Sequence, residues 1–265
     1  MSDLYVEVRG AGVPLVLLHG WGLNVRVWDT LGAALEGRLR LIAVDLPGHG
    51  RSPWAADCAE ASRQVQWIGQ AVAAAVGAAP YHLLGWSLGG QLALQWAGQP
   101  PRGLAPPMRL ALIAATPRFT AAPDWPYGTP EARLSRLAEG LQRDYRRTVS
   151  EFLQLQVRAS AAGEAVLEQL RAALFEHGDA QPEALAAGLE LLRTLDLRGE
   201  LGAIAAPTLA IAGQYDRVLL PGASRALAEA LPHARFAEIR RAAHAPFLSH
   251  TGEVADLLAD FLTSP

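Results

Sequence analysis

The chain has no lysine and only one cysteine, Cys58, among its 265 residues. A lone cysteine excludes a disulfide within the chain and fits a reducing compartment. No uninterrupted apolar run approaches the roughly 18 residues that a membrane-spanning helix needs. The N-terminal residues also lack the basic and apolar regions of a signal peptide. The sequence therefore predicts a cytoplasmic protein that does not associate with a membrane.

The charge balance gives no sign of a polyanionic partner. The 23 basic residues, all of them arginine, are outnumbered by 26 acidic residues, and the formal net charge is -3. Such a balance gives no electrostatic reason to expect binding to nucleic acid. The seven histidines are scattered and form neither an HxxxH nor an HExxH group. We therefore predict no metal and no other cofactor.

Short apolar runs alternate with helical patterns over most of the chain. Strands that alternate with helices predict an α/β fold, with a mostly parallel central sheet flanked by helices on both faces. An edge strand is expected at 4–9, and buried strands are expected at 14–18, 39–44, 81–84, 109–114, 207–212 and 234–239.

The segment from 116 to 195 interrupts this alternation. Four prolines punctuate its first part, and no strand-like run follows them. A helical block inside an α/β chain predicts an inserted cap. We expect an α/β core of residues 1–115 and 196–265 and a cap of residues 116–195. The expected cap helices lie at 131–140, 142–157, 164–177 and 182–194.

Residues 85–89 read GWSLG, and the neighbouring residues give this short pattern a structural context. An apolar run precedes it and a helical pattern follows it, so Ser87 stands at a sharp strand-to-helix turn. A serine nucleophile occupies such a turn in the α/β-hydrolase fold. The turn is tight, so the glycines two positions before and after the serine are expected for steric reasons. Ordinary turns also carry this pattern, so the prediction depends on the partners of Ser87.

A serine hydroxyl needs a base beside it, and the base needs an acid that fixes its tautomer. In this fold the three occur in the order Ser, Asp or Glu, His, each after a strand. His244 lies between the last expected strand and the last expected helix, so we predict that it is the base. His250 begins that helix, where capping is the simpler interpretation.

The acid is expected after the first strand beyond the cap. Asp216 follows the run at 207–212, so we predict that it orients His244. A turn or helix-capping role is the alternative for this residue. Asp196, at the exit of the cap, and Asp124, inside the cap, are weaker candidates.

The tetrahedral intermediate of acyl transfer carries a negatively charged oxygen, which two backbone N–H groups stabilise. One is expected from Leu88, directly after the nucleophile. The other is expected from Trp21, in the HGWG loop at 19–22 that follows a buried strand. We expect His19 to be structural, with hydrogen bonds inside that loop.

Three segments together resemble the α/β-hydrolase superfamily. They occur in the order LLHGWG at 17–22, DLPGHGRS at 45–52 and GWSLGG at 85–90. The resemblance extends along almost the whole chain and implies the α/β-hydrolase fold.

A narrower resemblance is to the pimeloyl-[acyl-carrier protein] methyl ester esterases of biotin synthesis. The core carries it in HGWGLN at 19–24 and AAHAPFLSH at 242–250. The cap carries it in RTVSEFLQLQ at 147–156 and GLELLRTLDLR at 188–198. The family implies a serine carboxylesterase that hydrolyses the methyl ester of a pimeloyl chain on acyl-carrier protein and releases methanol.

This resemblance implies roles for particular residues. Ser87 corresponds to the nucleophile, His244 to the base and Asp216 to the orienting acid, in a monomer without a cofactor. The residues implied to contact the substrate are Trp21, Ser87, Leu88, Phe152, Leu153, Gln154, Leu155 and Gln156.

The acidic carrier protein is expected to dock on arginines of the cap. Arg143, Arg147 and Arg158 have spacings that place them on one face of a single helix. Acidic residues stand where further basic ones are expected, at Glu151, Glu164 and Glu168.

Two other functions stay open. A broad-specificity carboxylesterase for small short-chain esters uses the same triad, so only the cap distinguishes it. A non-catalytic binding protein of the hydrolase fold is disfavoured because the expected triad is complete.

Overall fold

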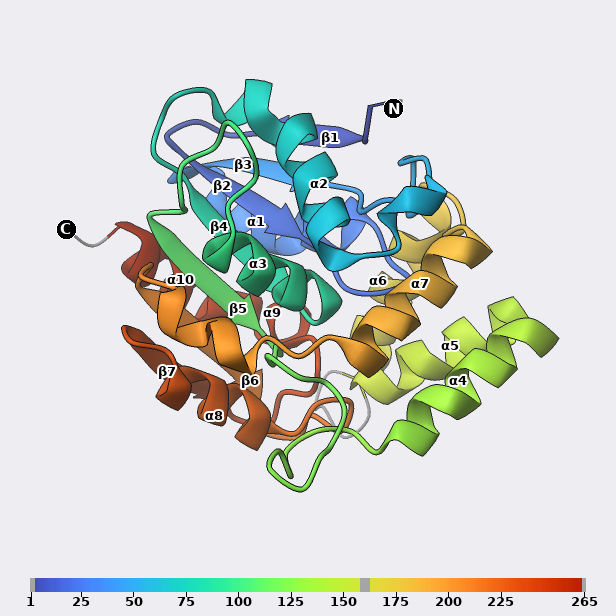
Figure 1. Ribbon diagram of the computed structural model, residues 1–265. Helices are drawn as coiled ribbons and strands as arrows, with labels where there is room; N and C mark the ends of the chain where they lie inside the picture. The colour runs from blue at the N-terminus through green and yellow to red at the C-terminus, as the bar shows by residue number, and fades with distance from the viewer. Residues whose placement is uncertain (1–2, 158–162, 264–265) are drawn as a thin grey trace.

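The computed structural model describes residues 3–157 and 163–263 (Figure 1). Within these residues, seven strands form one sheet in the order β1-β3-β2-β4-β5-β6-β7. β1 runs antiparallel to β3, and all other neighbouring strands are parallel. This confirms the predicted mostly parallel sheet. The strands are β1 (Val6–Arg9), β2 (Val13–Leu18), β3 (Leu39–Val44), β4 (His82–Trp86), β5 (Arg109–Ile113), β6 (Thr208–Gly213) and β7 (Ala234–Ile239).

The central strands form one large apolar core with the helices that flank them. In β2, Leu15, Val16 and Leu18 are fully buried, and such continuous apolar runs are typical of parallel strands covered on both faces. α2 and α3 pack against each other in front of the sheet in Figure 1. The core helices are α1 (Asp29–Leu35), α2 (Ala61–Val76), α3 (Leu88–Gly98), α8 (Pro221–Ala230), α9 (Pro246–Ser249) and α10 (Thr251–Thr263).

Strand register brings the carboxyl ends of several strands to one edge of the sheet. Leu18, the last residue of β2, pairs with Gly85 in β4. Gly213, the last residue of β6, pairs with Ile239, the last residue of β7. The loops after these four strands therefore meet at this edge, where open α/β sheets bind their ligands.

A helical segment is inserted between β5 and β6, as predicted. It contains α4 (Glu131–Arg143), α5 (Tyr145–Val157), α6 (Gly163–Glu176) and α7 (Pro182–Thr194). These helices lie together on the right of the sheet in Figure 1. The limits of the cap at residues 116 and 195 stay a prediction.

The helix expected at 142–157 is divided at Asp144, so the expectation that Arg143 and Arg147 share one helix is wrong. Asp144 has an extended backbone (φ −155°) and ends α4. Its carboxylate Oδ1 accepts a hydrogen bond from the backbone N–H of Arg147, 3.1 Å away, as a helix-capping side chain does. Arg143 therefore closes α4, while Arg147 lies in the first turn of α5.

Candidate active site

Ser87 occupies a strained turn between β4 and α3. Its φ of 56° lies in the left-handed region, which residues with a side chain rarely adopt outside functional sites. A β-carbon at Gly85 would overlap the carbonyl oxygen of Gly89, and one at Gly89 would overlap the carbonyl oxygen of Leu18. The expected steric need for both glycines is confirmed. The turn places the serine hydroxyl at the carboxyl edge of the sheet.

Ser87, His244 and Asp216 form a continuous chain of hydrogen bonds. His244 Nε2 lies 3.0 Å from Ser87 Oγ, and His244 Nδ1 lies 2.7 Å from Asp216 Oδ2. All three residues are buried, with Ser87 the most exposed at 8%. Because an ionised carboxylate only accepts, Nδ1 carries the proton and Nε2 is left to accept the serine hydroxyl hydrogen. This arrangement fits general-base activation of a serine.

Backbone groups from several loops hold the two partners of Ser87 in place. The second carboxylate oxygen of Asp216 accepts from the backbone N–H groups of Val218 (2.8 Å) and Leu219 (2.9 Å). The carbonyl of His244 accepts from Nε1 of Trp86 at 2.9 Å. The backbone N–H of His244 donates to the carbonyl of Gln156 in α5, also at 2.9 Å. The histidine is therefore fixed by the nucleophile strand on one side and by the helical insertion on the other.

The other candidates for the acid and the base, Asp196, Asp124 and His250, interact with residues outside the triad. Asp196 accepts from Arg198 and Arg118, and the hydrogen bond from Arg198 is the main cause that lowers its pKa to about 2. Asp124 pairs with the same Arg198 at 2.9 Å. His250 Nδ1 lies 2.8 Å from its neighbouring serine hydroxyl. Among the described residues, it is Asp216 that hydrogen-bonds His244.

His19 takes part in hydrogen bonds of the loop after β2. Its Nε2 accepts from the backbone N–H of Leu46 at 2.9 Å, and its Nδ1 lies 2.8 Å from the carbonyl oxygen of Gly20. Complete burial lowers its pKa to about 4, so the ring is neutral at pH 7. These contacts fit the structural role expected for this histidine.

The two residues expected to stabilise the oxyanion lie close together beside the nucleophile. Leu88 is the first residue of α3, where backbone N–H groups have no carbonyl partner within the helix. Trp21 is buried in the loop after β2, and its Nε1 donates to the carbonyl of Leu185 in α7 at 3.0 Å. A β-carbon placed at Gly188 in α7 would touch both Trp21 and Leu88. Their role as oxyanion donors stays a prediction.

The five α5 residues implied to contact substrate have different environments. Phe152 packs edge-to-face on Trp21, with ring centroids 5.1 Å apart. Leu153 and Gln156 are buried, whereas Gln154 and Leu155 are exposed. This segment therefore reaches Trp21 and the His244 loop with one side and solvent with the other.

The arginines expected to bind the carrier protein are exposed and carry acidic partners. Arg147 Nε donates to Glu151 at 2.8 Å, and Arg143 lies 3.8 Å from Glu139. Both pairs are four residues apart within one helix, and such pairs are weak in solvent. Arg158 lies outside the described residues.

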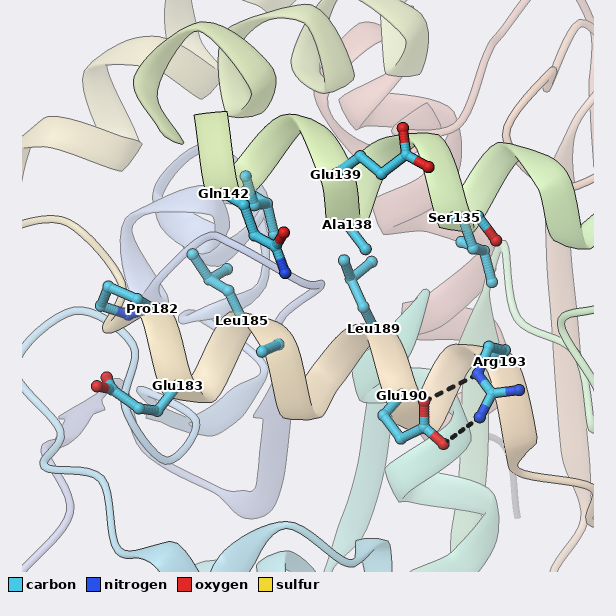
Figure 2. A pocket seen from close by; sticks show the side chains of 13 residues that line it. Ser135, Ala138, Glu139, Gln142, Pro182, Glu183, Leu185, Leu189, Glu190 and Arg193 are labelled. Atoms are coloured by element: carbon cyan, nitrogen blue, oxygen red, sulfur yellow. Dashed lines mark hydrogen bonds and ion pairs between the residues drawn. The ribbon is translucent and has the colours of Figure 1, made fainter. Parts of the chain in front are cut away.

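Two cavities adjoin α4. The larger, of about 630 Å³, lies between α4 and α7; its residues include Leu185, Leu189 and Glu190 (Figure 2). The smaller, of about 210 Å³, lies between α4 and α5 and includes Phe152 and Leu155. In the described part of the chain, neither of these two cavities is lined by the triad. The larger cavity includes Leu185, whose backbone carbonyl accepts from Trp21, and the smaller includes Phe152, whose ring packs on Trp21.

Sequence reasoning missed three residues that hold the site together. Trp86 fixes the His244 loop, and Gly213 allows that loop to approach β6, since a β-carbon there would overlap the carbonyl oxygen of Ala243. Gly188 allows α7 to approach Trp21. The tryptophan inside GWSLG and a glycine inside a helical pattern were the available signals, but their contacts are distant in the sequence.

Two features are absent from the described residues, 3–157 and 163–263. No helix there is long and apolar enough to cross a bilayer. No group of three or more His, Cys, Asp or Glu side chains is placed to hold a metal ion in that part of the chain.

The sheet order, the strained serine turn and the hydrogen-bonded Ser-His-Asp chain define the class of α/β-hydrolase-fold proteins. The sequence model of the alpha/beta hydrolase fold family matches residues 13–251. A pimeloyl-[acyl-carrier protein] methyl ester esterase of Nitrosomonas europaea is 39% identical over 251 residues, which are 94% of this chain and 95% of that protein. The chain belongs to the family of pimeloyl-[acyl-carrier protein] methyl ester esterases.

Solved structures of the same fold include enzymes of different kinds. An esterase from Exiguobacterium antarcticum has a TM-score of 0.89 at 24% identity, covering 98% of this chain and 96% of that one. A bromoperoxidase from Bacillus anthracis has the same TM-score at 23% identity, covering 98% and 95%. Likeness at this level shows the fold alone.

Proposed function

We propose that this chain is a serine carboxylesterase that hydrolyses the methyl ester of pimeloyl-[acyl-carrier protein] in biotin biosynthesis. The observation that carries the chemistry is the hydrogen-bonded chain of Ser87, His244 and Asp216. The family supplies the substrate, because a relative of that name is similar over nearly the whole length. We also propose a cytoplasmic monomer that needs no cofactor.

In the first half of the reaction Ser87 Oγ attacks the ester carbonyl carbon while its proton passes to His244 Nε2. The tetrahedral intermediate places its negative oxygen at the backbone N–H groups of Trp21 and Leu88. His244 then returns the proton to the methoxy oxygen, and methanol leaves. Asp216 keeps the imidazole in the required tautomer and stabilises its protonated form.

The second half releases the acid. His244 removes a proton from water, which attacks the acyl carbon on Ser87 and forms a second tetrahedral intermediate. Its collapse breaks the bond to Ser87 Oγ, and the serine regains its proton from His244. The product is a pimeloyl chain on the carrier with a free terminal carboxylate.

A second candidate function is a carboxylesterase for small short-chain esters. The observation in its favour is the state of the cap arginines, because Arg143 and Arg147 already face acidic partners. An acidic carrier gains less from cations whose charge is already compensated. The two functions share their chemistry and differ in what the cap recognises.

Hydrolysis of the carrier-linked methyl ester by the purified chain tests the proposal. Mass spectrometry of the carrier and methanol release are followed beside hydrolysis of p-nitrophenyl acetate, with Ser87→Ala as the control. We expect kcat/KM to be higher for the carrier-linked ester. Efficient hydrolysis of p-nitrophenyl acetate, with no methanol released from the carrier-linked ester, would contradict the proposal and favour the carboxylesterase for small esters. Growth of a biotin-requiring strain that lacks this esterase, when given this gene, gives an independent check.

A further inference from the structure

Gly188 lies in the middle of α7, where the helical insertion meets the two residues proposed to hold the oxyanion. A β-carbon at this position would lie 2.7 Å from Cδ1 and 3.1 Å from Nε1 of Trp21, and 3.3 Å from Cδ2 of Leu88. A helix interior disfavours glycine relative to alanine. At this position the glycine leaves the space that the indole ring occupies.

The indole of Trp21 has little freedom to move aside. Its Nε1 donates to the carbonyl of Leu185 at 3.0 Å, and its ring meets Phe152 edge-to-face at an interplanar angle of 86°. The residue is 2% exposed. Two helices of the insertion, α7 and α5, therefore contact the same side chain of the loop after β2 and limit its movement.

α7 is also held at both ends, at its start by the core loop after β3 and near its end by the segment after β5, so it cannot easily retreat from Trp21. At its start the backbone N–H of Gln181 donates to the carbonyl of Gly48 at 2.7 Å, and Ala184 packs where a β-carbon of Gly48 would stand. Near its end the carbonyl of Arg193 accepts from Thr120 Oγ1 at 3.2 Å.

The two sides of α7 have different surroundings. Leu185 and Leu189 point toward α4 across the larger cavity in Figure 2. Gly188 faces the core. Ala184 and Gly188 are four residues apart and thus share one helix face, which is the face that lies on the core loops.

We propose that Gly188 is a positioning residue for ester hydrolysis. By allowing α7 to lie directly on the indole of Trp21, it fixes the loop after β2 so that the Trp21 backbone N–H points at the developing oxyanion. This inference rests on the proposed roles of Ser87 and Trp21. It makes the helical insertion part of the catalytic geometry as well as a surface for the substrate.

The test is Gly188→Ala, assayed with p-nitrophenyl acetate. Loss of a complete oxyanion donor lowers kcat by about 10²–10³-fold, so a displaced donor should lower kcat roughly 10- to 100-fold while KM changes little. The matched control is Gly140→Ala in α4, whose β-carbon would lie 2.7 Å from Thr148 Oγ1 rather than near Trp21. We expect that control to keep most of its kcat even where thermal unfolding shows a loosened insertion.

A double variant adds a readout that general loosening does not produce. Trp21→Ala removes the whole indole, including the Cδ1 and Nε1 atoms that the β-carbon of Gly188→Ala would strike, so adding Gly188→Ala to Trp21→Ala should cost little further activity. Such non-additivity is what a direct contact predicts. If Gly188→Ala alone does not fold, the double variant must fold and keep the rate of Trp21→Ala.

Three results overturn the proposal: an unchanged kcat in folded Gly188→Ala, an equal loss in Gly140→Ala, or full additivity with Trp21→Ala. Failure of the proposed substrate is seen separately. If the wild-type protein hydrolyses p-nitrophenyl acetate but not the carrier-linked ester, only the proposed substrate is wrong. The kcat of Gly188→Ala on p-nitrophenyl acetate can still be compared with that of the wild type.

Discussion

The loops at the strand ends and the outer helices of the insertion hold their polar side chains in different ways. Ser87, His244 and Asp216 are buried and linked by hydrogen bonds to one another and to backbone groups. Arg143 and Arg147 are exposed, and each has an acidic partner on its own helix. Buried, charge-assisted hydrogen bonds are strong and directional, whereas exposed ion pairs contribute about 1 kcal/mol or less. The proposed chemistry therefore depends on a few fixed atoms, and the proposed docking of the carrier depends on a sum of weak contacts.

The largest expected effect is the loss of kcat when Asp216, the proposed orienting acid, is changed. Asp216→Asn should lower kcat by roughly 10⁴, as loss of the orienting carboxylate does in other triads, because the amide favours the wrong tautomer of His244. Asp196→Asn, which changes an exposed ion pair with Arg198, should stay near the wild-type rate. Steady-state hydrolysis of p-nitrophenyl acetate measures both. The reverse ranking would show that the acid was assigned to the wrong carboxylate.

The next largest effect concerns stability and pH. Burial is the main cause that lowers the pKa of His19 to about 4 and of His49 to about 3, from an ordinary value of 6.5. The stabilisation of the folded state by these two neutral histidines is complete above pH 6.5. It is lost as the pH falls, because the unfolded chain binds protons that the folded chain does not. For each histidine, the free energy of unfolding should fall by about 1.4 kcal/mol per pH unit as the pH drops from 6.5 to the folded pKa of that histidine.

Denaturant unfolding at several pH values measures this slope. In His49→Gln one such histidine is absent, so the free energy of unfolding should fall less steeply with acid. An identical slope in that variant would mean that His49 is not buried as a neutral ring. A substitution of the exposed Arg147 serves as the control, and its slope should match the wild type.

A smaller effect is expected in the cavity between α4 and α5, where we expect the acyl chain because Phe152 and Leu155, two residues implied to contact the substrate, line it. Leu155→Trp should partly fill that cavity, whose volume is about 210 Å³, and lower kcat/KM for the carrier-linked ester by roughly tenfold, about 1.4 kcal/mol. Ser135→Trp in the larger cavity between α4 and α7 is the matched control and should have little effect. A loss confined to Ser135→Trp would move the acyl chain to the larger cavity.

The smallest effect is expected at the docking arginines. Reversing the charge of Arg143 and Arg147 together should lower kcat/KM for the carrier-linked ester only a few-fold, because each exposed contact is worth about 1 kcal/mol or less. The loss should shrink in high salt, which screens exposed charges. Hydrolysis of p-nitrophenyl acetate should not change. Equal losses on both substrates would indicate a damaged insertion rather than lost docking.

The sequence predicted the sheet well because its pattern is physical and local. Buried parallel strands are unbroken apolar runs, so the limits of β3 and β7 were found to the residue. The serine turn was predictable because steric overlap demands Gly85 and Gly89 whatever surrounds them. The order of the triad then pointed to Asp216 and His244.

Other features depend on contacts that a sequence pattern does not carry. Good helix-forming residues surround Asp144, so the helical pattern continues through the place where α4 ends. The function of Gly188 rests on its contact with Trp21, far away along the chain. The short helical turns at Val25–Trp28 and Arg198–Ala203 have no clear period and were not predicted.

The claim that the reaction takes place at the buried triad of the core is tested most directly by the site of covalent labelling. Treatment with a fluorophosphonate, followed by peptide mapping, should place one label on Ser87, the residue whose Oγ lies 3.0 Å from His244 Nε2. Ser87→Ala should remain folded, lose the label and lose esterase activity by a factor on the order of 10³ or more. A label on another residue, or full activity in Ser87→Ala, would contradict the account.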